Sequence, residues 1–342
     1  MKLVVKDIKR ETKEAVSIYF KNGNFFNKLK YKPGQFLTLY VPVNGKIEKR
    51  LYSFSSNPYT DKDLKITVKE VENGLVSKYL CNGVKIGDQF EIEKPQGSFF
   101  VEPNKKDQKQ YVLFAGGSGI TPVLSIIKSV LTNEPMSKVL LVYANKNKES
   151  IIFHEEINAL FDEYPNTFKV EHILSENNET KENYHSGLAS NVLYIKIFNK
   201  HNLLFENNIY MICGPFGYME KTKEILSLNK VERKDILVEV FKSPEVKVYG
   251  KDRVSDVEII FKGQTHKIKV PGNKSILSVA MSNNIALPYS CRSGMCSTCK
   301  GVCVSGTIEM TEGHFLEKPE VDNGKILTCI SYPKSEQVTI QI

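Results

Sequence analysis

The chain of 342 residues has no long apolar run and no repeated or low-complexity segment. The uncharged stretch over residues 111–127 is interrupted by three glycines and a proline and falls short of the ~20 residues that cross a bilayer. The first residues, 1–7, contain no apolar core of signal-peptide length. We therefore expect a cytoplasmic protein without membrane insertion.

Basic residues never form a block of five or more, although the formal net charge is +8. Binding of nucleic acid is therefore not indicated. A lysine-rich solvated surface is the simplest account of this charge, and an acidic partner or anionic cofactors would also suit it. Hydrophobic residues make up 41% and charged residues 25%, as in soluble globular proteins, and the length predicts two or three domains.

The residue pattern changes along the chain. Residues 1–104 alternate apolar and polar positions and carry turn signals such as Asn44-Gly45, which predicts an antiparallel β-barrel. Residues 105–242 alternate apolar runs with helical stretches, which predicts βαβ units and a parallel sheet. Residues 243–253 indicate a linker, and residues 254–342 form a third domain that opens with two strands and a helix over 275–281.

Cysteine is scarce in the first two regions but clustered in the third, and the odd total of seven argues against a secreted disulfide framework. Cys291, Cys296 and Cys299 are spaced C-x4-C-x2-C, and Cys329 follows later. This spacing is typical of [2Fe–2S] ligation, because two sulfide-bridged irons need four thiolates and one loop can supply three of them. The alternative, a structural zinc site, normally uses two paired knuckles. We expect Cys303, two residues into the next strand, to be a small buried hydrophobe.

The loop over residues 289–299 resembles the cluster loop of plant-type ferredoxins, and the resemblance covers about the last 90 residues. It implies an α+β domain of the β-grasp fold that holds the cluster with the four cysteines.

A second set of residues in the first region suits a flavin. Arg50 can bind phosphate, Tyr52 can stack on the ring and Ser53 can reach its N5 atom. Gly74 can open a helix whose first amides, together with the Ser77 hydroxyl, face a pyrophosphate. Each residue alone is commonplace, and a purely structural role is the alternative.

Together they resemble the flavin-binding barrel of the ferredoxin–NADP reductase family, with its Arg-x-Tyr-Ser and later Gly-x-x-Ser motifs. The serines after Phe54 resemble FAD-using members. The resemblance implies FAD as the cofactor and the following binding residues: Arg50, Leu51, Tyr52, Ser53, Thr67, Val68, Lys69, Gly74, Val76 and Ser77.

The second region has a glycine-rich turn, Gly116-Gly117-Ser118-Gly119-Ile120-Thr121-Pro122, between a strand and a helix. Such a turn suits dinucleotide phosphates, with Thr121 as N-cap and Pro122 at the first helical position. A structural turn is the alternative. The Gly-Gly-x-Gly-Ile-Thr-Pro pattern resembles the NAD(P)-binding half of the same reductase family.

That resemblance extends to Cys213-Gly214-Pro215 and to the closing Glu239-Val240-Phe241. It implies nucleotide binding by Gly116, Gly117, Gly119, Thr121, Cys213, Gly214, Pro215 and Phe241. It also implies catalytic roles for Ser53, Cys213 and Glu239, with the thiol beside the nicotinamide. An inert buried thiol and an exposed strand carboxylate are the respective alternatives. Residues 145–148 hold two lysines and no acid, which favours NADPH slightly.

The domain order resembles reductase components of multicomponent oxygenases, including the phenylacetyl-CoA epoxidase reductase and hybrid-cluster-protein reductase types. It implies that NAD(P)H reduces FAD, FAD reduces the cluster, and the cluster reduces a protein acceptor, an oxygenase or another metalloenzyme. The alternatives are a stand-alone diaphorase that reduces small acceptors and a redox-sensing interaction module.

Overall fold

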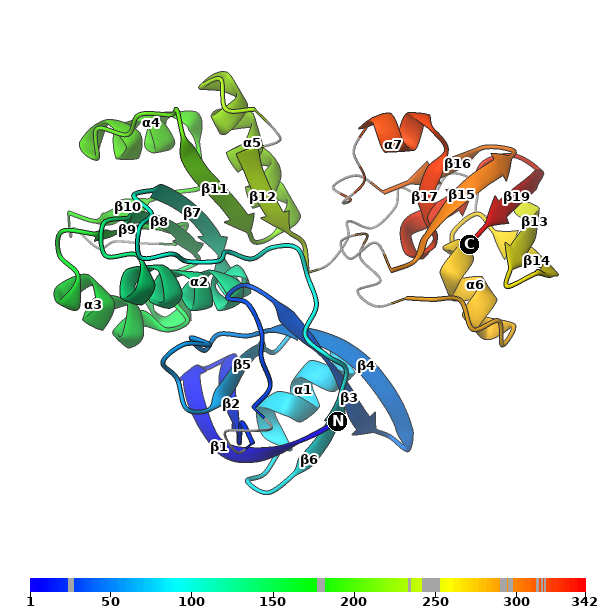
Figure 1. Ribbon diagram of the computed structural model, residues 1–342, viewed down its shortest axis with the longest axis horizontal. Helices are drawn as coiled ribbons and strands as arrows, with labels where there is room; N and C mark the ends of the chain where they lie inside the picture. Colours follow the sequence, from blue (N-terminus) through cyan, green and yellow to red (C-terminus); the bar gives the residue numbers. More distant parts are fainter. Residues whose placement is uncertain are drawn as a thin grey trace. The chain divides into compact units, whose positions relative to one another are not determined.

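The computed structural model describes residues 1–23, 28–176, 182–232, 235–241, 253–289, 294, 298–311, 314, 316 and 318–342. The chain divides into two compact units, Met1–Glu239 and Val240–Ile342 (Figure 1). The first unit contains a β-barrel followed by a parallel sheet with helices on both faces.

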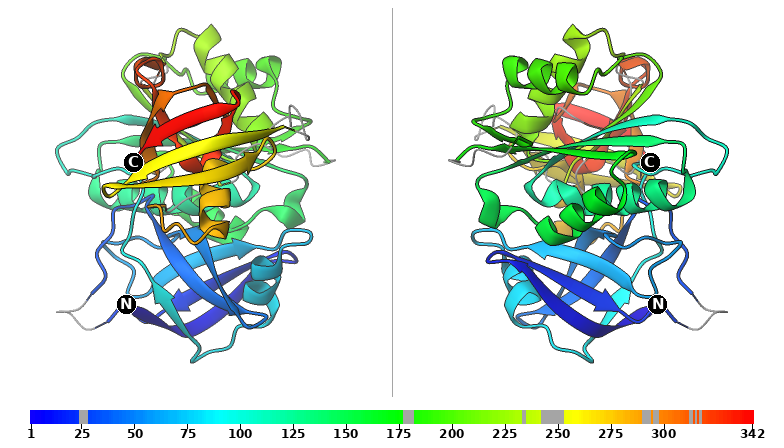
Figure 2. Two further views of the ribbon diagram at one scale, coloured as in Figure 1. Left: turned by 90° about the vertical axis from the view of Figure 1, so that its right-hand side faces the viewer. Right: turned by 90° about the vertical axis from the view of Figure 1, so that its left-hand side faces the viewer.

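The barrel is an antiparallel sheet with the strand order β4-β3-β6-β1-β2-β5, shown in blue from two sides in Figure 2. An isolated bridge between Phe54 and Ile66 connects the end of β4 to β5 and brings the two edges of the sheet together. The elements are β1 (Lys2–Thr12), β2 (Ala15–Phe20), β3 (Phe36–Val43), β4 (Lys46–Ser53), β5 (Leu64–Lys69), α1 (Leu75–Asn82) and β6 (Gln89–Ile92).

The predicted Asn44-Gly45 turn connects β3 to β4. Both residues have positive φ, 51° and 72°, which a two-residue hairpin turn requires and which Asn and Gly adopt at low cost. The turn sets Val43 opposite Lys46, and this register places Ser53 opposite Phe36 at the far end of the hairpin.

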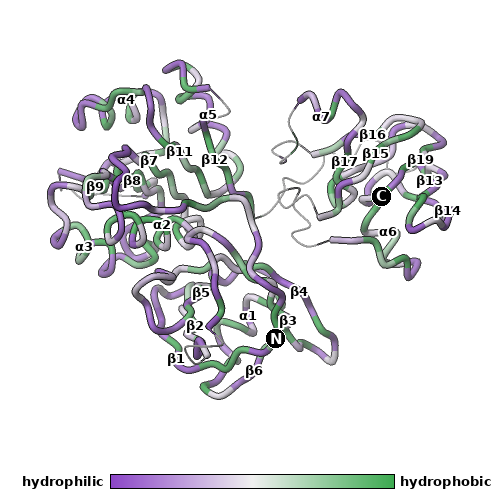
Figure 3. The backbone as a smooth tube through the Cα atoms, viewed as in Figure 1, coloured by the Kyte–Doolittle hydropathy of each residue, from purple (hydrophilic) through white to green (hydrophobic). Residues whose placement is uncertain are grey.

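The parallel sheet has the order β10-β9-β8-β7-β11-β12. In Figure 1, α2 and α3 cover one face and α4 and α5 the other, so its central strands are apolar on both faces (Figure 3). Its strands are β7 (Gln110–Gly116), β8 (Lys138–Asn145), β9 (Phe168–Leu174), β10 (Tyr184–Ser186), β11 (Asn208–Cys213) and β12 (Ile236–Glu239). Its helices are α2 (Ile120–Asn133), α3 (His154–Glu163), α4 (Asn191–Lys200) and α5 (Phe216–Leu228).

The start of α2 differs from the prediction. The expected N-cap, Thr121, lies inside the helix, which begins at Ile120 with Gly119 as its N-cap. The reason is a short 3-10 turn, Gly117–Gly119, that runs directly into the helix. The Thr121 hydroxyl therefore donates back to the Ser118 carbonyl, at 3.1 Å, instead of capping a later amide.

The second unit holds a mixed sheet of order β14-β13-β19-β15-β17 and a separate pair, β16 and β18. The expected helix is present as α6, which Ser275 caps by accepting from the Ser278 amide at 3.3 Å. The elements are β13 (Val254–Phe261), β14 (Gln264–Pro271), α6 (Ile276–Ser282), β15 (Lys300–Ser305), β16 (Ile308–Met310), α7 (Lys318–Asp322), β17 (Lys325–Leu327), β18 (Ser331–Pro333) and β19 (Gln337–Gln341). The predicted linker falls almost wholly in residues 242–252, outside the described residues.

Candidate functional site

The parallel sheet has one point where the chain reverses its direction of strand addition. Strand β7 pairs with β8 on one side and with β11 on the other. In open parallel sheets, ligands bind outside the carboxyl ends of the strands at such a point. The glycine-rich turn follows β7 and Cys213-Gly214-Pro215 ends β11, so the two predicted nucleotide segments lie side by side there.

The glycines of this turn pack closely against the end of β11. A Cβ on Gly119 would lie 2.0 Å from the Cys213 carbonyl oxygen, and a Cβ on Gly116 would lie 2.7 Å from Pro215. Gly117, with φ of 50°, has no described atom within 4 Å of its Cβ position. The turn is therefore tightly packed on one side and open at Gly117, which fits a dinucleotide phosphate at the beginning of α2.

Tyr143 holds the glycine-rich turn in place through a hydrogen bond and was not predicted as part of the site. Its buried hydroxyl donates to the Gly117 carbonyl at 3.0 Å. Tyr143 pairs with Ala115 in the sheet register, so the β7–β8 ladder carries the phenol under the loop. An aromatic residue in a buried strand is too common for the sequence alone to have shown this contact.

The three predicted catalytic residues come together. Cys213 and Glu239 are register partners on β11 and β12, and the Ser53 hydroxyl donates to Glu239 Oε1 at 3.3 Å. Glu239 is only 6% exposed, so the alternative of an exposed carboxylate is wrong. Burial, with the charge of Glu239, raises the pKa of the fully buried Cys213 well above its usual value, so the group stays a neutral thiol.

The flavin residues on β4 lie at the same end of the barrel as Ser53. Tyr52 is half-buried against the barrel core, and burial raises the pKa of its phenol. Arg50 is part-exposed, and its Nη1 donates to Glu48 Oε2 at 2.9 Å and to the Lys49 carbonyl at 2.8 Å. An aromatic face beside a part-exposed guanidinium fits the ring and phosphate of a flavin.

Helix α1 begins where the sequence predicts, with Gly74 as N-cap. A Cβ on Gly74 would lie 2.4 Å from Ser77 Oγ, so glycine permits the tight turn. The Ser77 hydroxyl accepts from the Val71 amide and donates to the Gly74 carbonyl, at 3.2 and 3.1 Å. Its hydroxyl thus holds the turn, and the first-turn amides, which have no partner within a helix, remain the groups suited to a pyrophosphate.

The other flavin candidates are on β5 and α1. Thr67 is buried, and its Oγ1 lies within hydrogen-bond distance of Ser17 Oγ at 2.8 Å and Ser55 Oγ at 3.0 Å. Val68 and Val76 are buried in the barrel core. Leu51 is half-buried on β4. Lys69, the last residue of β5, pairs with Glu14 at 3.4 Å.

The cluster domain brings two predicted ligands onto adjoining segments. Cys299 immediately precedes β15, Cys329 lies in a 3-10 turn (Thr328–Ile330), and the Thr328 amide donates to the Cys299 carbonyl at 3.1 Å. Gly294 has φ of 80°, and a Cβ there would lie 2.7 Å from the Ile330 side chain. Gly294, in the predicted loop, therefore lies close to the turn that carries Cys329.

The remaining ligands, Cys291 and Cys296, lie outside the described residues. Cys303, expected to be buried, is instead partly exposed on β15, where the strand pairing is irregular between Cys303 and Ser305. Phe241 belongs to the second unit, and 45% of it is exposed.

Family comparisons match all three regions. Residues 2–101 match the oxidoreductase FAD-binding domain, residues 113–224 the oxidoreductase NAD-binding domain and residues 259–334 the 2Fe-2S iron–sulfur cluster binding domain. Fold and site thus define an iron–sulfur flavoprotein reductase that uses NAD(P)H, FAD and a [2Fe–2S] cluster.

Full-length relatives share this arrangement. The ferredoxin reductase component of 3-ketosteroid-9-alpha-monooxygenase from Rhodococcus rhodochrous is 33% identical, over 99% of this chain and 96% of the relative. One of the subunits of 1,2-phenylacetyl-CoA epoxidase from Escherichia coli is 29% identical, over 99% and 96%. The solved structure of phthalate dioxygenase reductase has the same fold, with a TM-score of 0.68, 23% identity and coverage of 100% of this chain and 98% of that chain.

The chain belongs to the family of three-domain reductase components that transfer electrons from NAD(P)H through FAD and a [2Fe–2S] cluster to a protein acceptor. Among its described residues, no helix is both long and apolar enough to cross a membrane.

Proposed function

We propose that this chain is the reductase component of an oxygenase system, and that its acceptor is the oxygenase itself or a metalloprotein that serves it. The support comes from the relatives, which are named as components of a monooxygenase and an epoxidase. When bound, FAD takes the two electrons of NAD(P)H together as hydride and releases them singly to the cluster.

The nicotinamide end of the site is assigned to Cys213, Glu239 and Ser53. Cys213 stays a neutral thiol and would contribute a buried, uncharged surface beside the nicotinamide. Glu239 accepts from the Ser53 hydroxyl and so fixes the orientation of this hydroxyl, which would lie near the flavin N5 atom. Because Ser53 and Glu239 are both buried, their contact excludes water between barrel and sheet.

The phosphates are assigned to the two helix starts. The nicotinamide dinucleotide would be held by Gly116, Gly117, Gly119 and Thr121, with Gly214 and Pro215 alongside. Phe241 is a further proposed binding residue. The first-turn amides of Val76 and Ser77, which follow the N-cap Gly74, would bind the FAD pyrophosphate, with Arg50 as the charged partner. Leu51, Tyr52 and the backbone of Thr67, Val68 and Lys69 would contact the rest of the flavin.

The cluster is assigned to Cys291, Cys296, Cys299 and Cys329, within a domain over residues 254–342. The barrel over residues 1–104 and the sheet over residues 105–242 are the other two domains, and residues 243–253 are the linker. We place the protein in the cytoplasm. NADPH is favoured slightly, because Lys146 and Lys148 follow β8 with no acidic residue among residues 145–148.

The observation that carries the proposal is the meeting of Ser53, Cys213 and Glu239 between two domains whose families bind FAD and NAD. The test compares wild type with Cys329→Ser, using NAD(P)H and two acceptors: ferricyanide, which takes electrons from flavin, and cytochrome c as a one-electron protein acceptor. We expect the variant to keep ferricyanide reduction and to lose reduction of the protein acceptor. Unchanged reduction of cytochrome c would favour a stand-alone diaphorase, and no steady consumption of NAD(P)H by wild type would favour a redox-sensing module.

A further inference from the structure

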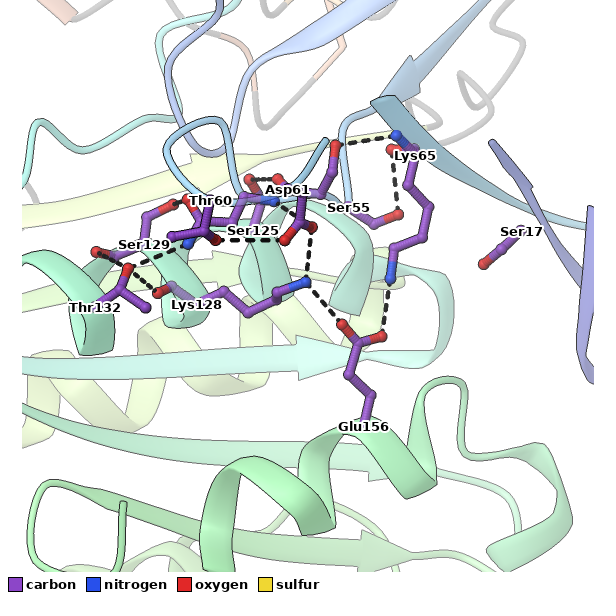
Figure 4. Close-up of polar contacts among 12 residues, drawn as sticks. Ser17, Ser55, Thr60, Asp61, Lys65, Ser125, Lys128, Ser129, Thr132 and Glu156 are labelled. Carbon is purple, nitrogen blue, oxygen red and sulfur yellow. Dashed lines mark hydrogen bonds and ion pairs between the residues drawn. The ribbon is translucent and has the colours of Figure 1, made fainter. Parts of the chain in front are cut away.

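One face of α2 is polar, and it runs from buried Ser125 and Ser129 to partly buried Lys128 and exposed Thr132. Ser125, Lys128, Ser129 and Thr132 recur at helical spacing and so share that face, as Figure 4 shows. Buried polar groups are costly unless they are paired, so the partners of Ser125 and Ser129 define what this face of the helix packs against.

The partners are on the barrel, in the segment that follows β4. Ser125 Oγ donates to the Ser56 carbonyl at 2.6 Å, and Ser129 Oγ donates to Asn57 Oδ1 at 3.1 Å. The side-chain amide of Asn57 in turn donates to Thr132 Oγ1 at 3.1 Å. The barrel and the nicotinamide domain thus meet through directional bonds, which specify one docking geometry more strictly than apolar contact does.

Charged side chains extend this contact between the barrel and the nicotinamide domain, which we call the seam. Glu156, in the first turn of α3, accepts from Lys65 Nζ at 2.8 Å and from Lys128 Nζ at 3.0 Å, and Lys128 also binds Asp61 at 2.8 Å (Figure 4). The Lys65 side chain is 4% exposed, and its ammonium lies 4.6 Å from the centre of the Phe153 ring. Removing Glu156 would leave the buried Lys65 ammonium without this ion pair, which makes the contact sensitive to a single substitution.

The seam connects directly to both proposed cofactor sites. Lys65 is on β5, and its carbonyl accepts from the Ser55 amide at 2.8 Å, two residues beyond Ser53. On the other side, α2 carries Lys128 in its middle and the glycine-rich turn at its beginning. A shift of α2 along the barrel would therefore move the turn and β11 relative to Ser53.

We propose that Lys65 and Glu156 are positioning residues for hydride transfer, whose buried ion pair fixes the barrel against the nicotinamide domain. This inference rests on the proposed assignment of Ser53, Cys213 and Glu239 to the nicotinamide–flavin contact. Lys65 and Glu156 touch neither proposed cofactor site, so they act only through the Ser53 segment and α2.

An open hollow of about 610 Å³ lies beside these residues and does not change the assignment. Its lining has equal numbers of acidic and basic side chains, Asp61, Asp63, Glu155 and Glu156 against Lys9, Lys62, Lys65 and Lys128, with Tyr19 and Thr60. This balance selects no charged ligand, and the hollow is the open end of the seam.

The test uses full-length holoenzyme with Lys65→Met, Glu156→Gln and the double variant. Stopped-flow reduction of the flavin gives the limiting rate and the nucleotide dissociation constant separately. Hydrogen exchange over residues 55–61 and 154–157 reports the seam without turnover. Lys6→Met is the matched control, because Lys6 forms an exposed pair with Asp63 on the same barrel, at 2.6 Å.

We expect each single variant to lower the limiting rate about tenfold, with less than about a twofold change in the dissociation constant, because positioning rather than binding is lost. The double variant should resemble Glu156→Gln, because that single variant already removes the ion pairs of Glu156 with both Lys65 and Lys128. Exchange should rise in both segments, and Lys6→Met should match wild type.

A limiting rate unchanged in Glu156→Gln, with faster exchange at the seam, would overturn the inference and leave only a structural contact. Glu156→Gln keeps the side-chain volume, so it decides the question if Lys65→Met does not fold. Failure of wild type itself to reduce its flavin with either nucleotide would instead refute the proposed function.

Discussion

The Ser53 hydroxyl lies 3.3 Å from Glu239 Oε1, although 186 positions separate the two residues in the chain. Ser53 ends a barrel strand and Glu239 ends a strand of the parallel sheet, so this bond is one of those that join the two halves of the first unit. Cys213 lies next to Glu239 on the neighbouring strand, which makes the bond the centre of the proposed hydride-transfer site.

Replacing either partner of this bond should slow flavin reduction by NAD(P)H. A hydrogen bond to a charged group contributes about 1.5–3 kcal/mol, so we expect a loss of roughly ten- to a hundredfold in Ser53→Ala and Glu239→Gln. Stopped-flow absorbance measures the rate. Ser137→Ala is the control, because this buried serine binds Glu134 at the opposite end of the sheet. Normal rates in both site variants would contradict the assignment.

Two glycines of the same turn should respond differently to alanine. In Gly119→Ala the new Cβ meets the Cys213 carbonyl at 2.0 Å, so overpacking should cost about 1–3 kcal/mol of unfolding free energy or more. In Gly117→Ala no described atom is near, and the positive φ costs about 1–2 kcal/mol.

The affinity for NAD(P)H distinguishes Gly117→Ala from Gly119→Ala. The Gly117→Ala methyl group enters the open side of the turn, so the NAD(P)H dissociation constant should rise although the protein stays folded. Thermal unfolding and equilibrium titration together check this. Wild-type affinity in Gly117→Ala would show that the phosphates bind elsewhere.

Local patterns predicted much of the fold but little of the packing between domains. The Asn44-Gly45 turn and the beginning of α1 at Gly74 depend on neighbouring residues only, and both were correct. Lys65 occupies an alternating strand, a pattern that suggests a solvent-facing lysine, yet it is 3% exposed because Glu156 covers it from α3. Such a pairing is set by tertiary structure and leaves no signal at either position.

The candidate site, too, was predicted only in part. The glycine-rich turn was recognisable from its sequence, whereas the exact start of α2 depended on a 3-10 turn that periodicity does not resolve. Tyr143 beneath Gly117 was missed, because strand patterns report burial and not the contact made. The roles of individual site residues remain predictions.

Cluster assembly should depend on Cys329 but not on Cys303. Cys329→Ser removes a proposed thiolate, so we expect loss of cluster iron, sulfide and the paramagnetic signal of the reduced form. Cys303→Ser is the matched control: its sulfur is partly exposed on β15 and lies 3.4 Å from the Ser305 carbonyl. A full cluster in Cys329→Ser, or its loss in Cys303→Ser, would refute the ligand set.

Acid should destabilise the nicotinamide domain through His172. Burial, aided by His154 and His185 and opposed by Glu171, lowers the pKa of His172 from 6.5 to about 3. Between pH 6.5 and pH 3, His172 therefore binds a proton in the unfolded chain but not in the folded chain. The free energy of unfolding has its full value above pH 6.5 and falls by about 1.4 kcal/mol per pH unit between pH 6.5 and pH 3.

His172→Phe should remove this slope while keeping the ring stacked on Tyr184, whose centroid lies 4.7 Å away in the wild type. Urea unfolding followed by circular dichroism at several pH values gives the difference between the variant and wild type. The same pH dependence in both proteins would show that His172 is not buried as a neutral ring.

The central claim is that one chain carries hydride from NAD(P)H to FAD and single electrons onward to its own cluster. An anaerobic titration of the purified holoenzyme with NADH and with NADPH tests it, following flavin absorbance and the cluster's paramagnetic signal together. We predict that about one and a half equivalents of nucleotide bleach the flavin and develop the cluster signal, since FAD accepts two electrons and the cluster one. Flavin bleaching with no cluster signal, or no response to either nucleotide, would contradict the account.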